Sequence, residues 1–175
     1  PQSHDARQDV LLTIDLARSM DDVLKVFAIR AATYMADQHC PYAEEFDGND
    51  FCAAHFIGYS DGEPAGCLRV RFFAGFVKFE RLAVRREYRQ SKLAFRLVRE
   101  AMRYAAAKGY AQVYGHARHD LVRFWQSFGF RPLQAGQALS FSDVDYVEMA
   151  GPIKADPHAV KIGDSPYRII RPEHR

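Results

Sequence analysis

The sequence predicts an α/β fold with a mixed, mostly antiparallel central sheet of six to seven strands that is flanked by helices. Three β-type runs follow one another between short turns, which is typical of an antiparallel meander. A long amphipathic run then ends at Gly109 and leads into another strand-like run, as in a βαβ crossover to a parallel strand. Hydrophobic residues make up 48% of the 175 residues, which is enough to build the core of one domain.

The first half of the chain is expected to contain an arm, one helix and four strands. Residues 1–9 are polar and predict a flexible arm. Ser19 or Asp21 can cap the first helix, which ends before Pro41 because proline cannot continue it. An acidic loop follows at residues 41–50. The four strands are predicted at residues 10–16, 53–59, 66–73 and 76–84.

The second half is expected to alternate helices and strands and to end in a tail. The amphipathic helix is predicted at residues 91–108, and a short helix at 120–128 is closed by Gly129. Residues 151–175 are rich in proline and charge, and we expect them to pack on the domain or on a partner subunit. Strands are predicted at residues 111–115, 130–133 and 143–149. The chain is thus divided into an arm (1–9), a domain (10–150) and a C-terminal tail (151–175).

Composition excludes several classes of function. The formal net charge is +2, too small to indicate nucleic-acid or membrane-surface binding. The three cysteines are widely spaced and form no CxxC pair, so neither a disulfide framework nor a zinc site is expected, and a reducing compartment is the default. We find no apolar run of transmembrane length and no signal-peptide pattern, which predicts a cytoplasmic protein.

A basic loop between a strand and a helix predicts a phosphate site. The run 79–84 enters the loop 85–92, and the long helix begins there. The unpaired N–H groups of a first helical turn and the helix dipole both favour an anion. We therefore expect a cofactor that carries phosphate. Further along the helix, Arg96, Arg99 and Arg103 fit a solvated face equally well.

Two motifs and the order of elements resemble the GNAT N-acyltransferase superfamily over residues 10–150. The run 89–94, Arg-Gln-Ser-Lys-Leu-Ala, is similar to the family loop Arg/Gln-x-x-Gly-x-Gly/Ala that cradles the coenzyme A pyrophosphate, with Lys92 in place of glycine. The run 124–130, Phe-Trp-Gln-Ser-Phe-Gly-Phe, is similar to Phe-Tyr-x-x-x-Gly-Phe. Trp125 stands where the family has the tyrosine that protonates the departing thiolate.

The resemblance implies acetyl-CoA or another acyl-CoA as co-substrate and no metal. It also implies that the strand before the loop offers backbone N–H groups to the acyl carbonyl and the pantetheine arm. The cofactor-binding residues implied in this way are Leu82, Ala83, Val84, Arg89, Gln90, Ser91, Lys92, Leu93, Ala94 and Trp125.

The N-terminal half looks like that of ElaA-type acetyltransferases. The residues that carry this likeness are Arg30, Tyr34, Gln38, Cys40-Pro41-Tyr42, Glu45, Asp47-Gly48-Asn49-Asp50 and His55. The patterns Arg-x-x-x-Tyr, Glu-x-Asp-x-x-Asp and Arg81-Leu82-Ala83-Val84 are also similar to acyl-homoserine-lactone synthases and N-acyl amino acid synthases.

The implied reaction is transfer of an acetyl or short acyl group to a small-molecule amine by direct attack. One alternative is a synthase of acylated amino acids or lactones that uses acyl carrier protein. Another is a non-catalytic acyl-CoA sensor. A homodimer is compatible with the expected edge strands.

Two residues are candidates for proton transfer. Glu80 is expected to act as the base directly or through water, because by a period of two it shares one face of its strand with Lys78, Leu82 and Val84. Its alternative is an ion pair with Arg81 or Lys78. His116, at the end of the next strand, titrates near neutral pH and is the second candidate, with a structural histidine as its alternative.

The sequence allows two roles for the carboxylates of the acidic loop. These carboxylates can bind an amino-bearing substrate, or they can pair with arginines of the helix and sheet and lock the loop in place. The candidate substrate-binding residues are Arg30, Asp47, Asp50 and Arg71, and the candidate partners in the structural alternative are Arg30, Arg69 and Arg71 with Glu45, Asp47 and Asp50.

Overall fold

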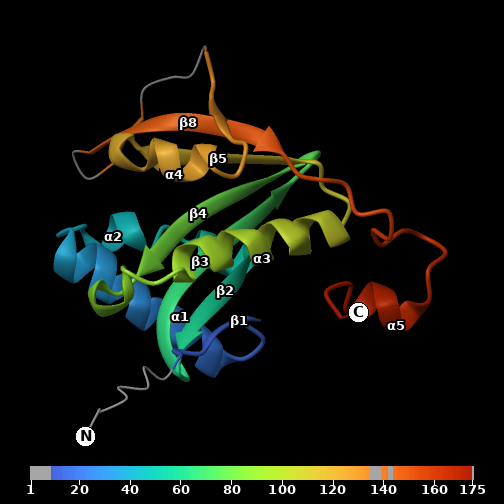
Figure 1. Cartoon of the computed structure of the whole chain (residues 1–175), viewed down its shortest axis with the longest axis horizontal. Helices are drawn as coiled ribbons and strands as arrows, with labels where there is room; N and C mark the ends of the chain where they lie inside the picture. The colour runs from blue at the N-terminus through green and yellow to red at the C-terminus, as the bar shows by residue number, and fades with distance from the viewer. Residues whose placement is uncertain (1–8, 135–138, 142–143, 175) are drawn as a thin grey trace, which may run out of the picture.

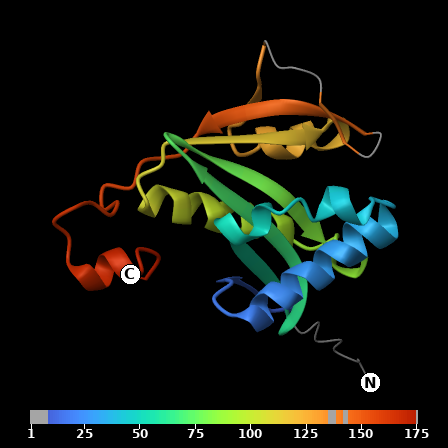
Figure 2. The same cartoon turned by 180° about the vertical axis from the view of Figure 1, so that it is seen from behind.

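The computed structural model describes residues 9–134, 139–141 and 144–174, and it shows a single mixed sheet with helices on both faces (Figures 1 and 2). The strand order is β1-β2-β3-β4-β5-β8-β6, and β7 pairs with β8 off this path. Only β4 and β5 are parallel among the pairs of described strands. The predicted fold class is therefore confirmed. The sheet has eight described strands where six to seven were predicted, and two of them, β6 and β7, are only two and three residues long.

Most elements lie close to where the sequence predicts them, but a short helix, Tyr42–Glu45, lies in the segment predicted to be an acidic loop. The strands are β1 (Leu12–Leu16), β2 (Ala53–Ser60), β3 (Glu63–Phe73), β4 (Phe76–Val84), β5 (Gln112–Arg118), β6 (Arg131–Pro132), β7 (Leu139–Phe141) and β8 (Val144–Pro152). The α-helices are α1 (Met20–Arg30), α2 (Tyr42–Glu45), α3 (Leu93–Ala107), α4 (Val122–Gln126) and α5 (Pro166–Ile170). A π-helical segment, Ala31–Asp37, continues α1. Of the two expected caps, Ser19 is the one that caps α1, by accepting a hydrogen bond from Asp22 N at 3.1 Å.

Several boundaries differ from the prediction. The expected helix at residues 120–128 is a 3-10 turn, His119–Leu121, followed by the shorter α4. β8 continues to Pro152, past the predicted domain boundary at residue 150, and α5 lies in the segment expected to be a tail. Residues 1–8 of the predicted arm, residue 143 of the predicted last strand and residue 175 of the tail lie outside the described residues.

The two main helices pack on opposite faces of the sheet. Helix α3 buries Leu93 and Leu97 against β2, β3 and β4, and α1 buries Val26 and Ile29 against the other face. α3 begins so close to the sheet that a Cβ on Gly58 would lie 2.7 Å from Cδ1 of Leu93. Glycine at this position therefore lets the first turn of α3 reach the sheet.

A β-bulge interrupts β4. Cys67 pairs with Ala83 and Arg69 pairs with Glu80, so Arg81 and Leu82 together oppose a single residue of β3. Arg81 has a φ of +54°, a left-handed conformation that is strained for an arginine. The extra residue reverses the alternation of side chains along the rest of the strand.

This reversal corrects one prediction. Lys78 and Glu80 lie on the face that α1 covers, opposite Arg71 and Arg69 of β3, but Leu82 and Val84 pack against the core on the α3 face. The prediction that all four residues share one face is therefore wrong. A strict period of two holds only up to the bulge.

The sheet opens beside the bulge. β4 and β5 pair only over Val77–Phe79 and Val113–Gly115. Beyond these positions the two strands diverge, which Figure 1 shows as a V between β4 and β5. The bulge and the short parallel pairing together leave a gap between two neighbouring strands.

The C-terminal segment returns to the domain. Ile153 is buried in the main core, Val160 N donates to Ala107 O at 2.8 Å, and Glu173 pairs with Arg18 at 2.8 Å. These contacts match packing on the domain, one of the two arrangements expected for the tail. Within the described ranges, none of the helices has the length and apolarity needed to cross a bilayer.

The close approach of α3 can be tested at Gly58. We expect Gly58→Ala to lower the free energy of unfolding by about 1–3 kcal/mol, because the new methyl group overlaps Leu93. Urea denaturation measures this change. In a Leu93→Ala background the effect of Gly58→Ala is expected to shrink, and an unchanged effect would show that the clash lies elsewhere.

Candidate functional site

A cleft of about 290 Å³ lies between β4 and β5, where the sheet opens. β4 supplies one wall, β5 the other, and Trp125 of α4 and the loop after α2 complete it. Of the predicted site residues, the cleft is lined by Asp47, Arg71, Glu80, Leu82, His116 and Trp125. Its further lining residues are Tyr34, Gln38, Asn49, Lys78, Phe79, Arg81, Ala117, Arg118, Leu121 and Tyr146.

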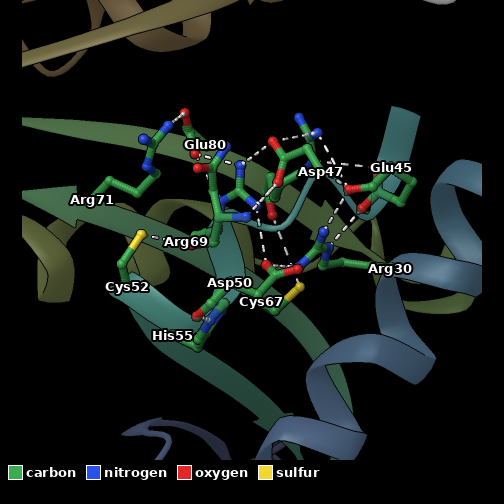
Figure 3. Close-up of polar contacts among 12 residues, drawn as sticks. Arg30, Glu45, Asp47, Asp50, Cys52, His55, Cys67, Arg69, Arg71 and Glu80 are labelled. Carbon is green, nitrogen blue, oxygen red and sulfur yellow. Dashed lines mark hydrogen bonds and ion pairs between the residues drawn. The ribbon is translucent and has the colours of Figure 1, made fainter. Parts of the chain in front are cut away.

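A buried network of ion pairs lies behind the β4 wall (Figure 3). Arg30 of α1 is fully buried and pairs through Nε with Glu45 Oε1 at 2.6 Å and through Nη1 with Asp50 Oδ1 at 2.5 Å. Its Nη2 donates to the carbonyl of Glu45 at 2.8 Å. The loop after α2 is thereby tied to α1.

Arg69 of β3 is the centre of the same network. Its side chain is 1% exposed, and it holds Asp47 by two parallel hydrogen bonds, from Nη1 at 2.9 Å and from Nη2 at 3.0 Å. Nη1 also donates to Asp50 Oδ1 at 3.0 Å, and Nε donates to Glu80 Oε2 at 2.7 Å. One guanidinium therefore joins β3, β4 and the acidic loop, in the bidentate geometry that arginine favours.

The cations keep these carboxylates charged. Burial raises the pKa of Asp47 and of Asp50. At Asp47, Arg69 and the hydrogen bonds from Asn49 outweigh burial, and at Asp50 the two arginines do, so both pKa values lie below their usual range. The pairing expected as the structural alternative for the acidic loop is thus present for Arg30 and Arg69, whereas Arg71 pairs with Glu80 of β4. Contact of Asp47 or Arg71 with a substrate stays a prediction. Arg30 and Asp50 are buried behind the cleft.

Glu80 faces the cleft inside a cluster of cations. Lys78 Nζ lies 2.7 Å from Glu80 Oε1, and Arg71 Nη1 lies 3.4 Å from the same oxygen. Burial raises the pKa of Glu80, yet Lys78 and Arg69 outweigh burial and hold it below its usual range. The ion pair between Glu80 and Lys78, which is the alternative to a catalytic role for Glu80, is present. A base role for Glu80 stays a prediction, and its lowered pKa weakens it as a proton acceptor.

His116 lies on the opposite wall and is neutral at pH 7. Burial and the charge of Lys78 lower its pKa. Tyr114 Oη donates to Glu148 Oε2 at 2.5 Å and lies 3.1 Å from His116 Nε2. Since the tyrosine proton points to Glu148, its oxygen accepts from Nε2–H, which leaves Nδ1 of His116 with a lone pair.

The bulge is held from the helical side. Tyr34, in the π-helical segment, donates its hydroxyl to Leu82 O at 2.7 Å. Arg81 Nη2 donates to Glu44 O at 3.0 Å, and its Nε lies 3.3 Å from Glu45 Oε2. These contacts offset the strain of the left-handed backbone at Arg81 and set the direction of the peptide groups that face the cleft.

The basic loop before α3 is ordered by its own contacts. Arg89 pairs with Asp37 at 2.7 Å and donates from Nε to Val84 O at 3.0 Å. Ser91 Oγ accepts from Leu93 N at 3.3 Å, and Lys92 is exposed. Gln90 is exposed too, while the side chain of Leu93 is buried in the core, so that only its backbone can face a cofactor. Pyrophosphate binding here stays a prediction.

A small apolar pocket of about 20 Å³ adjoins the cleft. It shares Phe79, His116, Ala117 and Trp125 with the cleft and is closed by Phe130 and Met149, among others. Trp125 stacks on Phe130 with ring centres 6.0 Å apart. No group of three His, Cys, Asp or Glu side chains among the described residues is placed to hold a metal ion.

Sequence reasoning missed part of the cleft. Tyr34 was noted only as part of the N-terminal resemblance, although it anchors the bulge. Arg118 and Tyr146 also line the cleft, and they face each other because β5 pairs antiparallel with β8. Residue spacing carries no signal for that pairing. A basic residue at the end of a strand beside the predicted His116 was the one available hint for Arg118.

The comparison with known proteins decides the family. The acetyltransferase (GNAT) family model matches residues 23–130. The chain belongs to the GNAT family. It is therefore an acyltransferase enzyme, and the resemblance seen in the motifs is confirmed.

Relatives and solved structures agree with this assignment. The uncharacterized N-acetyltransferase YjcF of Bacillus subtilis is 26% identical over 71% of this chain and 89% of its own length. ElaA of Escherichia coli superimposes with a TM-score of 0.71 at 22% identity, covering 81% of this chain and 99% of ElaA. FeeM, an N-acyl amino acid synthase from uncultured soil microbes, has a TM-score of 0.69 at 13% identity, covering 82% of this chain and 92% of FeeM. At these identities the two structures show the shared fold alone.

The role of Arg69 can be tested by removing its charge. We expect Arg69→Met to lower the free energy of unfolding by about 3–5 kcal/mol, because it leaves Asp47, Asp50 and Glu80 without a common partner. Chemical denaturation measures the loss. Arg103→Met is the matched control, since it breaks only the exposed pair with Glu100 and should change stability by less than about 0.5 kcal/mol.

The same variant tests the pH dependence of stability. Folded-state pKa values below those of the unfolded chain stabilise the parent above about pH 4, and this stability is lost as the pH falls through the folded values. Arg69→Met is expected to flatten that acid limb. If the free energy of unfolding falls equally in the parent and in Arg69→Met below pH 4, the pairing of Arg69 with Asp47, Asp50 and Glu80 is contradicted.

Proposed function

We propose that this enzyme transfers an acetyl or short acyl group from acyl-CoA to a small-molecule amine that attacks the thioester directly. The observation that carries the proposal is the cleft between β4 and β5, with the bulge on one wall and His116 on the other. The GNAT family match supports the type of reaction. The acceptor and the acyl donor are the proposed part.

The donor is proposed to bind along the end of β4. Leu82, Ala83 and Val84 form the end of this strand. The basic loop with Arg89, Gln90, Ser91 and Lys92 follows it and leads to Ala94 in the first turn of α3. The pyrophosphate would lie at the N-terminus of α3, where N–H groups and the helix dipole favour an anion. The contacts of Tyr34 and Arg81 with the bulge keep the peptide groups of β4 oriented before the donor arrives, which limits reorganisation during the reaction.

The reaction requires one proton transfer from the amine. The neutral amine forms a C–N bond to the acyl carbon, the C–S bond breaks, and coenzyme A leaves as its thiolate. The proton that the nitrogen loses passes to His116 Nδ1 and then, through water, to the thiolate. Thiols are weak bases, as the reference pKa of about 8.5 for cysteine illustrates, so the thiolate leaves without a dedicated acid and Trp125 need not donate a proton. Glu80 acting through water remains the alternative base.

A short acyl group fits the cleft better than a long one. The apolar pocket beside His116 and Trp125 has room for a group of about methyl size. A long acyl chain would require Phe130 or Met149 to move. This favours an acetyl donor over the alternative, a synthase of acylated amino acids that draws on acyl carrier protein, whose support here is the fold shared with FeeM.

The first test is calorimetric titration with coenzyme A, acetyl-CoA and octanoyl-CoA, followed by thiol release with a panel of amines. Binding of acetyl-CoA at least as tight as that of octanoyl-CoA, together with amine-dependent thiol release, supports the proposal. Preference for the octanoyl donor favours the synthase alternative. Acyl-CoA binding without turnover of any amine would favour a sensor.

Arg89 tests the pyrophosphate site. We expect Arg89→Ala to weaken acetyl-CoA binding by about tenfold, the order of one charge-assisted contact, with little change in melting temperature because its pair with Asp37 is exposed. Calorimetry gives the affinity. Arg103→Ala, on α3 and away from the loop, is the control. Equal affinity in Arg89→Ala and parent would remove Arg89 from the site.

The two candidate bases can be separated by their pH profiles. Because its pKa lies below 6.5, neutral His116 is lost only as the pH falls below about 6.5, and kcat/KM should fall with it. We expect His116→Gln to lower kcat/KM by about 100-fold at pH 7.5 and to abolish that acid limb. A limb that persists in His116→Gln and disappears in Glu80→Gln would assign the base to Glu80.

A further inference from the structure

The carboxylates in the wall of the cleft are already occupied. Two carboxylates line it within the described part of the chain, Asp47 and Glu80. Arg69 holds both oxygens of Asp47. Glu80 is held through one oxygen by Arg69 and through the other by Lys78. An acceptor that presents an ammonium group would have to break one of these pairs to reach a carboxylate.

The cations of the same wall retain donor capacity. Arg71, which has five N–H donors, makes one ion pair, at 3.4 Å to Glu80, and its guanidinium lies 5.1 Å from the ring centre of Phe73. Its side chain is 22% exposed and lines the cleft. Lys78 lies directly opposite Arg71 in the β3–β4 register, on the same face. Two cations thus stand side by side at the cleft.

The side chains that line the cleft carry more positive than negative charge. Four cations line the cleft in the described residues, Arg71, Lys78, Arg81 and Arg118, against the two carboxylates. Carboxylates outside the lining pair with some of these cations, and Glu45 Oε2 lies 3.3 Å from Arg81 Nε. Asp120 pairs with Arg118 at 3.2 Å from a largely exposed position, and Glu148 accepts the hydroxyl proton of Tyr114. The lining itself therefore carries an excess of positive charge.

We propose that the acceptor is an amine that also carries a carboxylate, and that Arg71 and Lys78 bind this carboxylate. The inference rests on the proposed acetyl transfer and names its substrate class. The guanidinium of Arg71 can hold a carboxylate by two parallel hydrogen bonds, and Lys78 adds a point charge beside it. The same cations disfavour a charged ammonium nearby and thereby favour the neutral amine that attacks the thioester.

The test compares L-amino acids with their own C-terminal amides as acceptors for acetyl-CoA, measured by thiol release. Each pair differs in the carboxylate and in the amine pKa that the carboxylate raises, so kcat/KM is calculated on the concentration of neutral amine. We expect kcat/KM for the acid to exceed that for its amide by about tenfold or more. Arg71→Met is expected to remove most of this preference, and Arg103→Met to leave it unchanged because Arg103 pairs with Glu100 on α3.

The outcomes separate this inference from the proposed function. Amides used as well as acids, or an equal loss for both in Arg71→Met, would overturn the carboxylate-bearing acceptor while acetyl transfer stands. The carboxylate-bearing acceptor is also overturned, and acetyl transfer stands, if only amines without a carboxylate are acetylated. Acetyl-CoA binding with no acetylation of any amine would overturn the acceptor and favour a sensor. Absence of both acetyl-CoA binding and thiol release would overturn the two proposals together.

Discussion

The pairing of Arg69 with three carboxylates is the interaction on which the functional half of the molecule depends. It joins the middle of the sheet to β4 through Glu80 and to the acidic loop through Asp47 and Asp50. Arg30 repeats the arrangement from α1. Because these charges are buried, each is stable only with its partners in place, so the loop, α1 and β4 hold one arrangement together.

The bulge in β4 depends on the same scaffold. Arg81 adopts a strained backbone conformation, and its side chain reaches the carbonyl groups at the end of α2, which Arg30 also contacts. Tyr34 holds the next peptide group from the π-helical segment. The strain is therefore maintained by helices packed on the sheet, and it separates β4 from β5 enough to form the cleft.

The network also affects which side chains in the cleft can accept a proton near neutral pH. Asp47 and Glu80 face the cleft, but their cationic partners hold their pKa values low. His116, whose pKa is lowered by burial, is a neutral base at physiological pH on the other wall. The carboxylates thus stabilise the structure of the site. In the proposed reaction, His116, Arg71 and Lys78, which line the cleft, act on the bound amine.

The sequence by itself determined most of the strands and the two main helices, limited the cap of α1 to Ser19 or Asp21, and determined the end of α3 at Gly109 and the family motifs, because all of these depend on neighbours close in the chain. Only the tertiary structure decided the partners of each charge. Arg69 and Asp47 lie 22 positions apart, and their contact depends on strand register and on the path of a loop. A single extra residue in β4 also placed Leu82 on the opposite face from Glu80. Period-two reasoning cannot anticipate this change, because the bulge is stabilised by residues of other elements.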